Sequence, residues 1–169
     1  SSLIIGMMLF ITALYVSAAG DGFSFSDGFD QSKSGMWMIH NEDAARWSLE
    51  EKIGSMRIYT TPTDTYSTNN NLKNLFYIPL PNDFDNYQIT AKISFPIQPY
   101  QNFHMGGVAL LCDNGGIPDQ NNLIRMEYVY AGVRRFETQY EAGGSAANTF
   151  SGTVEINVNN PYWVRIKKE

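Results

Sequence analysis

Apolar and polar residues alternate at every second position in several segments, and this pattern constrains the fold more than any other feature of the chain. It is clearest in residues 87–95, where Tyr87, Ile89, Ala91, Ile93 and Phe95 alternate with Gln88, Thr90, Lys92 and Ser94. Successive side chains of a strand point to opposite faces, so this segment predicts a strand with one buried and one hydrated face. Residues 56–59, 154–158 and 162–167 follow the same pattern.

Shorter segments of the same character predict further strands at residues 37–40, 47–50, 74–78, 104–112, 121–130 and 133–141. Glycine-containing turns such as Asn114-Gly115-Gly116 and Gly143-Gly144 separate them. No segment shows a convincing helical period. Short strands at regular spacing predict one all-β domain, with two antiparallel sheets packed face to face. We expect Ile89, Ile93 and Ile156 in the core between them.

The N-terminal segment has the character of an export signal. Residues 3–16 form an apolar run without charge, and small residues, Ser17-Ala18-Ala19-Gly20, follow it. We predict a signal peptide, incomplete at its N-terminus, over residues 1–19, with cleavage after Ala18 or Ala19. Residues 21–169 would then be a secreted domain without membrane contact, truncated at its C-terminal strand. A retained anchor is the alternative, although the run is shorter than the roughly 20 residues that span a bilayer.

The net charge limits the classes of ligand that the chain can bind, and the cysteine count limits its covalent cross-links. The net charge is −5 and no basic stripe is present, which argues against nucleic acid as a ligand. The single cysteine, Cys112, ends the apolar run of residues 108–112. It cannot form a disulfide within the chain, and we expect it to be a small buried apolar residue.

Several short motifs occur in an order that resembles a known family. They include Phe25-Ser26-Asp27-Gly28-Phe29-Asp30, Trp47-Ser48-Leu49, Gly54-Ser55-Met56-Arg57-Ile58-Tyr59-Thr60, Met105-Gly106-Gly107-Val108-Ala109-Leu110 and the segment at residues 162–169. Their order is similar to that of the concanavalin A-like domains that follow the catalytic propeller in family 43 β-xylosidases. The resemblance spans residues 23–169 and implies a lectin-like jelly-roll sandwich beside a glycoside hydrolase domain. No propeller is present, so it implies no hydrolase activity for these residues.

Catalytic signatures are missing from the sequence. The Glu-x-Asp-x-x-Glu strand of glucanases with this fold is absent, and His40 and His104 lie far apart, without a cysteine cluster that could complete a zinc site. Glu127 and Glu137 could face each other across neighbouring strands, and a carboxylate pair can cleave a glycoside. Three arginines lie near them in the sequence: Arg125, Arg134 and Arg135. We therefore interpret these charges as a solvated lattice of ion pairs and expect no enzymatic activity.

Sugar recognition needs flat aromatic faces and planar polar groups, and 14% of the residues are aromatic. Trp37 and Trp47 are expected in the core. On the outward side of predicted strands, Arg57 and Tyr59, and likewise Trp163 and Arg165, could form an aromatic and cationic patch. The predicted ligand-binding set is Arg57, Tyr59, His104, Arg125 and Glu127.

A structural calcium ion is a further expectation that follows from the resemblance. Sandwiches of this type often hold Ca²⁺ near the first strand, where Asp27 and Asp30, with Asp21 nearby, could supply oxygen ligands. Ordinary turn aspartates are the alternative.

The predicted function is a secreted, non-catalytic carbohydrate-binding or accessory domain that takes a poly- or oligosaccharide. It would act beside a neighbouring catalytic domain. Two alternatives stay open. One is a structural or adhesion module that packs against another domain through an apolar patch. The other is a glycosidase or polysaccharide lyase, which would need a carboxylate pair in a pocket.

Overall fold

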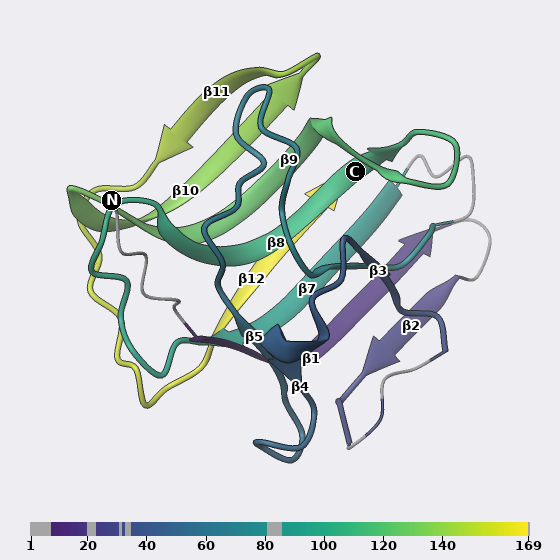
Figure 1. Ribbon diagram of the computed structural model, residues 1–169, viewed down its shortest axis with the longest axis horizontal. Helices are drawn as coiled ribbons and strands as arrows, with labels where there is room; N and C mark the ends of the chain where they lie inside the picture. The colour runs from purple at the N-terminus through teal and green to yellow at the C-terminus, as the bar shows by residue number, and fades with distance from the viewer. Residues whose placement is uncertain (1–7, 20–22, 31, 33–34, 81–85, 169) are drawn as a thin grey trace.

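The computed structural model describes residues 8–19, 23–30, 32, 35–80 and 86–168 of the chain (Figure 1). These residues form antiparallel strands in three sheets, together with one short 3₁₀ turn, η1 (Ala44–Arg46). The fold is therefore all-β, as the alternation predicts. Within the described residues no helix has the length and apolar character needed to cross a membrane.

The largest sheet has six strands. Its order is β12 (Tyr162–Lys168), β7 (Asn86–Ser94), β1 (Met8–Ala19), β5 (Met56–Tyr59) and β4 (Trp47–Ser48), and β2 (Ser24–Asp27) also pairs with β1. A four-stranded sheet has the order β11 (Ser145–Phe150), β10 (Val133–Ala142), β9 (Pro118–Ala131) and β8 (His104–Asp113). Strands β3 (Met38–His40) and β6 (Leu75–Tyr77) form a separate pair.

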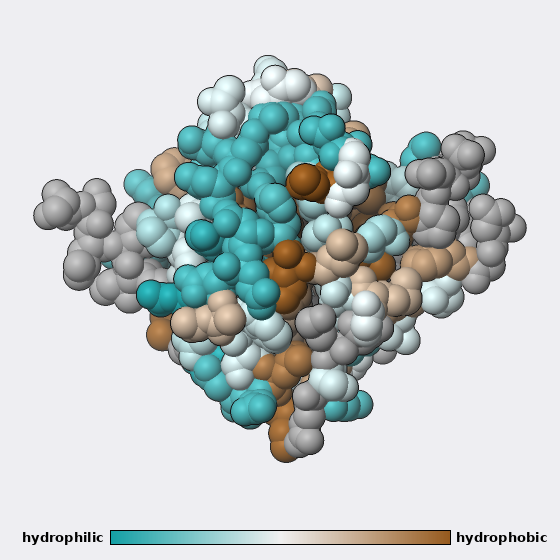
Figure 2. All heavy atoms as spheres, turned by 45° about the vertical axis from the view of Figure 1, so that its right-hand side comes forward, coloured by the Kyte–Doolittle hydropathy of each residue, from teal (hydrophilic) through white to brown (hydrophobic). Residues whose placement is uncertain are grey.

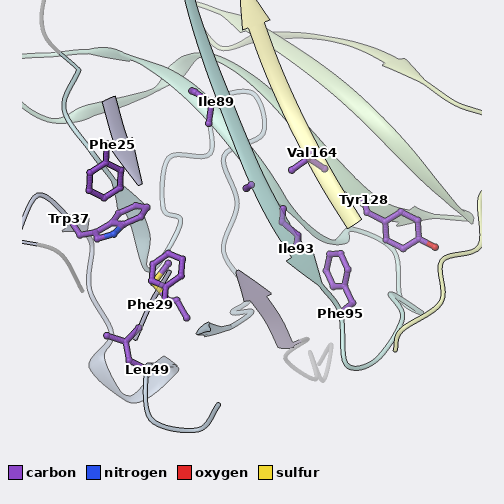
Figure 3. Packing of buried hydrophobic residues seen from close by; sticks show 11 residues of the cluster. Phe25, Phe29, Trp37, Leu49, Ile89, Ile93, Phe95, Tyr128 and Val164 are labelled. Carbon is purple, nitrogen blue, oxygen red and sulfur yellow. The ribbon is translucent and has the colours of Figure 1, made fainter. Parts of the chain in front are cut away.

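One buried apolar cluster joins residues of the two larger sheets (Figure 3). Ile89 and Ile93 of β7 and Val164 of β12 come from the six-stranded sheet, and Tyr128 of β9 comes from the four-stranded one. The rings of Phe95 and Tyr128 lie 5.7 Å apart between centroids. The predicted burial of the two isoleucines is confirmed. Removal of the cluster's apolar side chains from water stabilises the fold.

The two tryptophans and Ile156, all predicted to lie in the core, differ in how deeply they are buried. Trp37 is buried, and its ring contacts Phe25 at 5.8 Å between centroids. Trp47 and Ile156 are partly buried and pack against the cluster.

The predicted strand at residues 154–158 is wrong. These residues form no ladder, and their backbone groups bond to scattered partners. The backbone amide of Val154 donates to the carbonyl of Arg134 at 2.8 Å, and the side-chain Nε2 of Gln98 donates to the carbonyl of Ile156 at 2.9 Å. Val154, Ile156 and Val158 are nevertheless half-buried while the residues between them are exposed. The alternation correctly predicted burial here, but not strand pairing.

The segment predicted to be a signal peptide contributes strand β1. Its residues pair with β7 from Phe10 opposite Ser94 to Ala19 opposite Asn86, and with β2 and β5 on the other side. Residues 1–7 and 20–22 lie outside the described part of the chain. Cleavage after Ala18 or Ala19 therefore stays a prediction, and in the uncleaved chain this segment occupies an interior position of the six-stranded sheet.

The predicted burial of Cys112 is wrong, since its side chain is exposed. A β-bulge explains the difference. The pairing of β8 with β9 shifts from Leu111 opposite Leu123 to Cys112 opposite Asp119, so that three residues of β9 have no counterpart in β8. Cys112 lies at this irregularity, one residue before the end of β8, where the regular pairing that buries alternate side chains is interrupted.

Candidate functional site

The four-stranded sheet has one face toward the core and one face away from it. Tyr128 and Phe136 lie directly opposite each other on β9 and β10 and belong to the core cluster. Their neighbours in each strand therefore point to the other face. We call five of these side chains the polar row, namely Arg125, Glu127, Glu137, Gln139 and Glu141. All five are buried, with exposed fractions between 1% and 8%.

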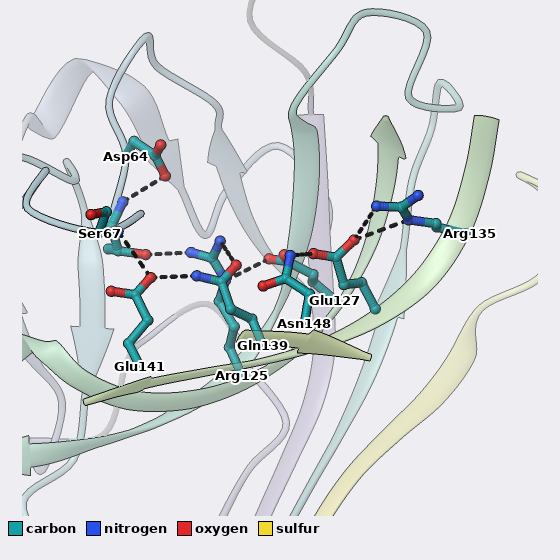
Figure 4. A network of polar contacts seen from close by, with 10 residues as sticks. Asp64, Ser67, Arg125, Glu127, Arg135, Gln139, Glu141 and Asn148 are labelled. Atoms are coloured by element: carbon teal, nitrogen blue, oxygen red, sulfur yellow. Dashed lines mark hydrogen bonds and ion pairs between the residues drawn. The ribbon is translucent and has the colours of Figure 1, made fainter. Parts of the chain in front are cut away.

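Arg125 is the centre of the polar row (Figure 4). Its Nη2 donates to Oε1 of Gln139 at 2.6 Å, and its Nη1 donates to Oγ1 of Thr65. Its Nε lies 3.2 Å from Oε2 of Glu127. The guanidinium is planar and presents donors in a fixed fork, so these three contacts hold it in one orientation.

The network continues to both sides of Arg125. Toward β10, the amide of Gln139 donates to Glu141, whose Oε1 also accepts the backbone N–H of Ser67 at 3.2 Å. Toward β11, Arg135 donates to Oε2 of Glu137 at 2.7 and 3.0 Å, while Asn148 donates to Oε1 of the same carboxylate. Every carboxylate of the row therefore contacts at least one protein donor or cation.

The loop between β5 and β6 covers part of the polar row. It crosses the four-stranded sheet in Figure 1 and is held there by polar contacts. Asn70 donates to the side chain of Asn121 at 2.8 Å, and the hydroxyl of Ser67 donates to the carbonyl of Gly144 at 3.0 Å. The loop thus supplies the two residues, Thr65 and Ser67, that complete the network.

A cleft of about 760 Å³ runs between this loop and β8. Arg125 and Glu127 line it, together with Asp64 and Lys73 from the loop and His104 from the start of β8. Apolar side chains of residues 72–80 and 103–111 form much of the remaining wall. Figure 2 shows apolar atoms in the middle of one face, with a hydrophilic patch on one side of them and residues of mixed character on the other. A cleft of this size with a few convergent polar groups is the usual form of a small-molecule or oligomer site.

Burial shifts the pKa values of two groups that line the cleft, Glu127 and His104. The pKa of Glu127 is raised to about 7, mainly by burial; the charge of Arg125 opposes the shift, and the charges of Glu137 and Asp64 add to it. Burial also lowers the pKa of His104. Neither ring nitrogen of His104 has a hydrogen-bond partner among the described residues. The ring of Tyr100 packs edge-on against the imidazole, with 5.2 Å between the ring centroids. Burial therefore favours the neutral form of the His104 imidazole, and its ring nitrogens are not engaged by other described residues.

The raised pKa of Glu127 predicts a pH dependence of stability. A carboxyl group with a folded pKa of about 7 and an ordinary value of 4.5 binds more protons in the folded state between these values. Its stabilising contribution is therefore complete below about pH 4.5 and is lost as the pH rises through about 7. The slope would be at most about 1.4 kcal/mol per pH unit.

Urea unfolding at a series of pH values between 4.5 and 8, compared with Glu127→Gln, measures this slope. We expect the variant to show a smaller decrease in the free energy of unfolding over this range. If the free energy of unfolding depends on pH equally in both proteins, the pKa of Glu127 is not raised in the folded state.

The structure divides the predicted ligand-binding set between two sheets. His104, Arg125 and Glu127 line the cleft. Arg57 and Tyr59 lie on β5 of the six-stranded sheet, where the guanidinium carbon is 4.8 Å from the ring centroid. Both contact Glu51, Arg57 as an ion pair and Tyr59 through its hydroxyl. Tyr59 also borders the cleft, but Arg57 does not line it.

The outward direction predicted for Trp163 and Arg165 is confirmed. Both side chains are exposed on β12, with the amine of Lys92 5.7 Å from the Trp163 ring centroid and Nε of Arg165 donating to Thr90 at 3.1 Å. This surface belongs to the six-stranded sheet and is separate from the polar row.

Asp27 has the contacts of a turn residue. One carboxylate oxygen accepts the backbone N–H of Phe29 at 2.7 Å and the other accepts the indole N–H of Trp37 at 2.8 Å. Asp30 is exposed, and Asp21 lies outside the described residues. In the part of the chain that the structure describes, no three His, Cys, Asp or Glu side chains are grouped so as to hold a metal ion.

The interpretation of the charges as a solvated lattice is wrong. Glu127 and Glu137 do face each other across β9 and β10, and arginines do pair with them, but the carboxylates are buried. Sequence reasoning also missed Gln139, Glu141 and Thr65. The alternation in residues 133–141 placed the first two on the face of Glu137, whereas no local signal could place the loop over them.

The fold and site define an all-β, antiparallel domain with a largely apolar cleft beside a buried polar row on one sheet. A scan against models of protein families, a search of curated proteins and a search of solved structures each found no match.

Proposed function

We propose that this chain is a non-catalytic carbohydrate-binding domain and that the cleft beside the polar row is its binding site. We further propose that the two larger sheets form a concanavalin A-like jelly-roll sandwich. This finer assignment is supported by the single apolar cluster to which both sheets contribute and by the order of motifs along the sequence.

The observation that carries the proposal is the burial of five hydrogen-bonding side chains on a sheet face turned away from the core. Burial of charged groups costs several kcal/mol per ion even when they are paired. A face with only a structural role would be apolar where covered or hydrated where open. A network of fixed, partly desolvated polar groups beside a cleft is instead typical of a binding site.

Unsatisfied atoms in and beside the cleft indicate the ligand chemistry. Among the described residues, Oε2 of Glu141 lacks a hydrogen-bond partner, as do both ring nitrogens of His104. Donors and acceptors are thus both available. A sugar hydroxyl can donate and accept at once, and the C–H face of a sugar ring suits the apolar wall of the cleft. A polyhydroxylated ligand fits both requirements.

The contacts of the two facing glutamates support binding without catalysis. Both oxygens of Glu137 are engaged, by Arg135 and Asn148, and Glu127 is paired with Arg125. Glycoside cleavage needs one carboxyl group that can donate a proton and a second that can reach the sugar or a water. Glu137 has no free oxygen for the second role.

Export, and an accessory role beside a catalytic domain, complete the proposal. The apolar run and small residues of the N-terminal segment support secretion. The accessory role is supported by the resemblance alone.

Retention on insoluble polysaccharide tests the proposal. We expect the chain to be retained on xylan or cellulose, to be released by soluble oligosaccharide, and to liberate no reducing sugar. Glu127→Gln keeps the shape of the side chain but removes its charge, and should weaken retention about tenfold. Arg165→Gln, an exposed change on the other sheet, is the control and should bind normally. Failure to bind any polysaccharide would refute the proposal. Release of reducing sugar would instead support the alternative function, a glycosidase.

Docking to a neighbouring domain is the second candidate function. Phe103, Ile97 and Val133 are 71%, 52% and 42% exposed. The segments that carry Phe103 and Val133 are adjacent, since the amide of Phe103 donates to the carbonyl of Tyr130 and the amide of Gly132 donates to the side chain of Asn102. Exposed apolar side chains gathered at one end of a sheet are typical of a contact surface.

A further inference from the structure

We propose that Phe150, backed by Arg135, is a stacking subsite next to the polar row, and that the ligand is therefore an extended oligosaccharide rather than a single sugar. This inference rests on the proposed function and specifies its substrate class. It concerns the β11 side of the polar row, which the cleft does not include.

Phe150 is an exposed ring held in a fixed position. Its exposed fraction is 58%, and the guanidinium carbon of Arg135 lies 4.1 Å from the ring centroid. The same guanidinium is fixed by its two hydrogen bonds to Glu137. One face of the ring is thus occupied by a cation, and the exposed remainder is available for contact.

The backbone after Phe150 is anchored as well. The amide of Ser151 donates to the carbonyl of Phe136 at 2.9 Å, and the amide of Phe136 donates to the hydroxyl of Ser151 at 3.1 Å. Ring, guanidinium and backbone therefore lose little further freedom when a ligand binds. Preorganisation of this kind favours affinity because the ordering cost has already been met in the free protein.

The strand register relates this ring to the cleft. Phe150 lies opposite Glu137, Glu137 opposite Glu127, and Glu127 opposite Gly107. These four residues form a line across the sheet, perpendicular to the strands. Phe150 and Glu127 are two strand spacings apart, about 10 Å. Glu127 lines the cleft, so a ligand that reaches both the cleft and Phe150 must be longer than one sugar ring.

The two ends of this line favour a defined ligand chemistry. At the cleft end, polar groups bind hydroxyls; at the other end, an aromatic ring binds an apolar C–H face. Pyranoses whose hydroxyls are all equatorial present such faces, and their β-linked chains are extended. A linear chain of xylose or glucose units therefore fits, whereas an acidic glycan would bring its carboxylates toward Glu127, Glu137 and Asp64.

Titration calorimetry with β-linked xylo- and cello-oligosaccharides of one to six sugars tests the inference. We expect the affinity of the native chain to rise with chain length and then level off. Phe150→Ala should remove that rise, weakening binding of the long chains about tenfold while leaving monosaccharide and disaccharide binding unchanged. Trp163→Ala, which removes an aromatic ring of 53% exposure from the other sheet, should leave the whole series unchanged.

The outcomes separate this inference from the function on which it rests. If the native chain binds the series and Phe150→Ala binds it equally well, the subsite is refuted and the proposed function stands. If the native chain binds no member, both are refuted. Equal unfolding midpoints of native and variant chains in urea confirm that a loss of binding is local.

Discussion

Replacing Arg125 by methionine is expected to lower the free energy of unfolding by about 3–5 kcal/mol, as is typical when one partner of a buried ion pair is removed. The side chain is 8% exposed and contacts Thr65, Gln139 and Glu127. Methionine fills a similar volume, so packing is largely kept. The loss comes from the buried partners, because Glu127 and Gln139 are left with unpaired polar atoms.

Urea unfolding followed by tryptophan fluorescence measures this effect. Arg165→Met is the matched control, because Arg165 is exposed on β12 and a surface change of this kind costs within about 0.5 kcal/mol. Arg125→Lys should be intermediate, since lysine keeps the charge but lacks the planar fork. If Arg125→Met and Arg165→Met unfold at the same urea concentration, the polar row is not a connected network.

A methyl group added at Gly107 should destabilise the four-stranded sheet by roughly 3 kcal/mol, at the upper end of the usual cost of overpacking. A Cβ atom there would lie 2.0 Å from the carbonyl oxygen of Met126 and 2.6 Å from Cα of Glu127. These atoms belong to the backbone of β9 and cannot rotate away. Gly107→Ala must therefore push β8 and β9 apart beside Glu127.

Gly152→Ala is the control for this substitution. A Cβ atom at Gly152 meets no atom within 4 Å, so the same change should have little effect on the unfolding midpoint. Thermal unfolding followed by circular dichroism compares the two variants. A Gly107→Ala variant as stable as Gly152→Ala would show that β8 and β9 do not approach each other closely at this position.

Local pattern predicted the strands well where the alternation was strong. Ile89 and Ile93 were placed in the core because period-2 alternation and one-sided burial have the same cause. Strand β11 was missed because its residues, Ser145–Phe150, include small and polar side chains with little strand preference. The Gly143-Gly144 turn that joins it to β10 was predicted, and both glycines adopt positive φ there.

The apolar run at the N-terminus shows a different limit. An uncharged apolar segment of this length is compatible with an export signal and with a strand inside a sheet, and its pattern alone does not distinguish them. The structure places residues 8–19 between β7 and β5, a long-range pairing that no local signal contains.

The candidate site could be predicted only in part, because it depends on register and on a loop. Arg125 and Glu127 share a face by their spacing alone. That Glu137 lies opposite Glu127, and that Arg57 lies in another sheet, follows from pairings between distant segments. The burial of the polar row depends on Thr65 and Ser67, about 60 to 74 positions away from their partners in the sequence.

The bulge between Leu111 and Cys112 has a practical consequence for the study of this protein. It presents the chain's one thiol to solvent at the edge of the cleft, with no second cysteine to compete for a reagent. A maleimide dye sensitive to its surroundings can thus be attached at a single known position without any mutation. Changes in its emission would follow ligand entry in real time, in the wild-type sequence.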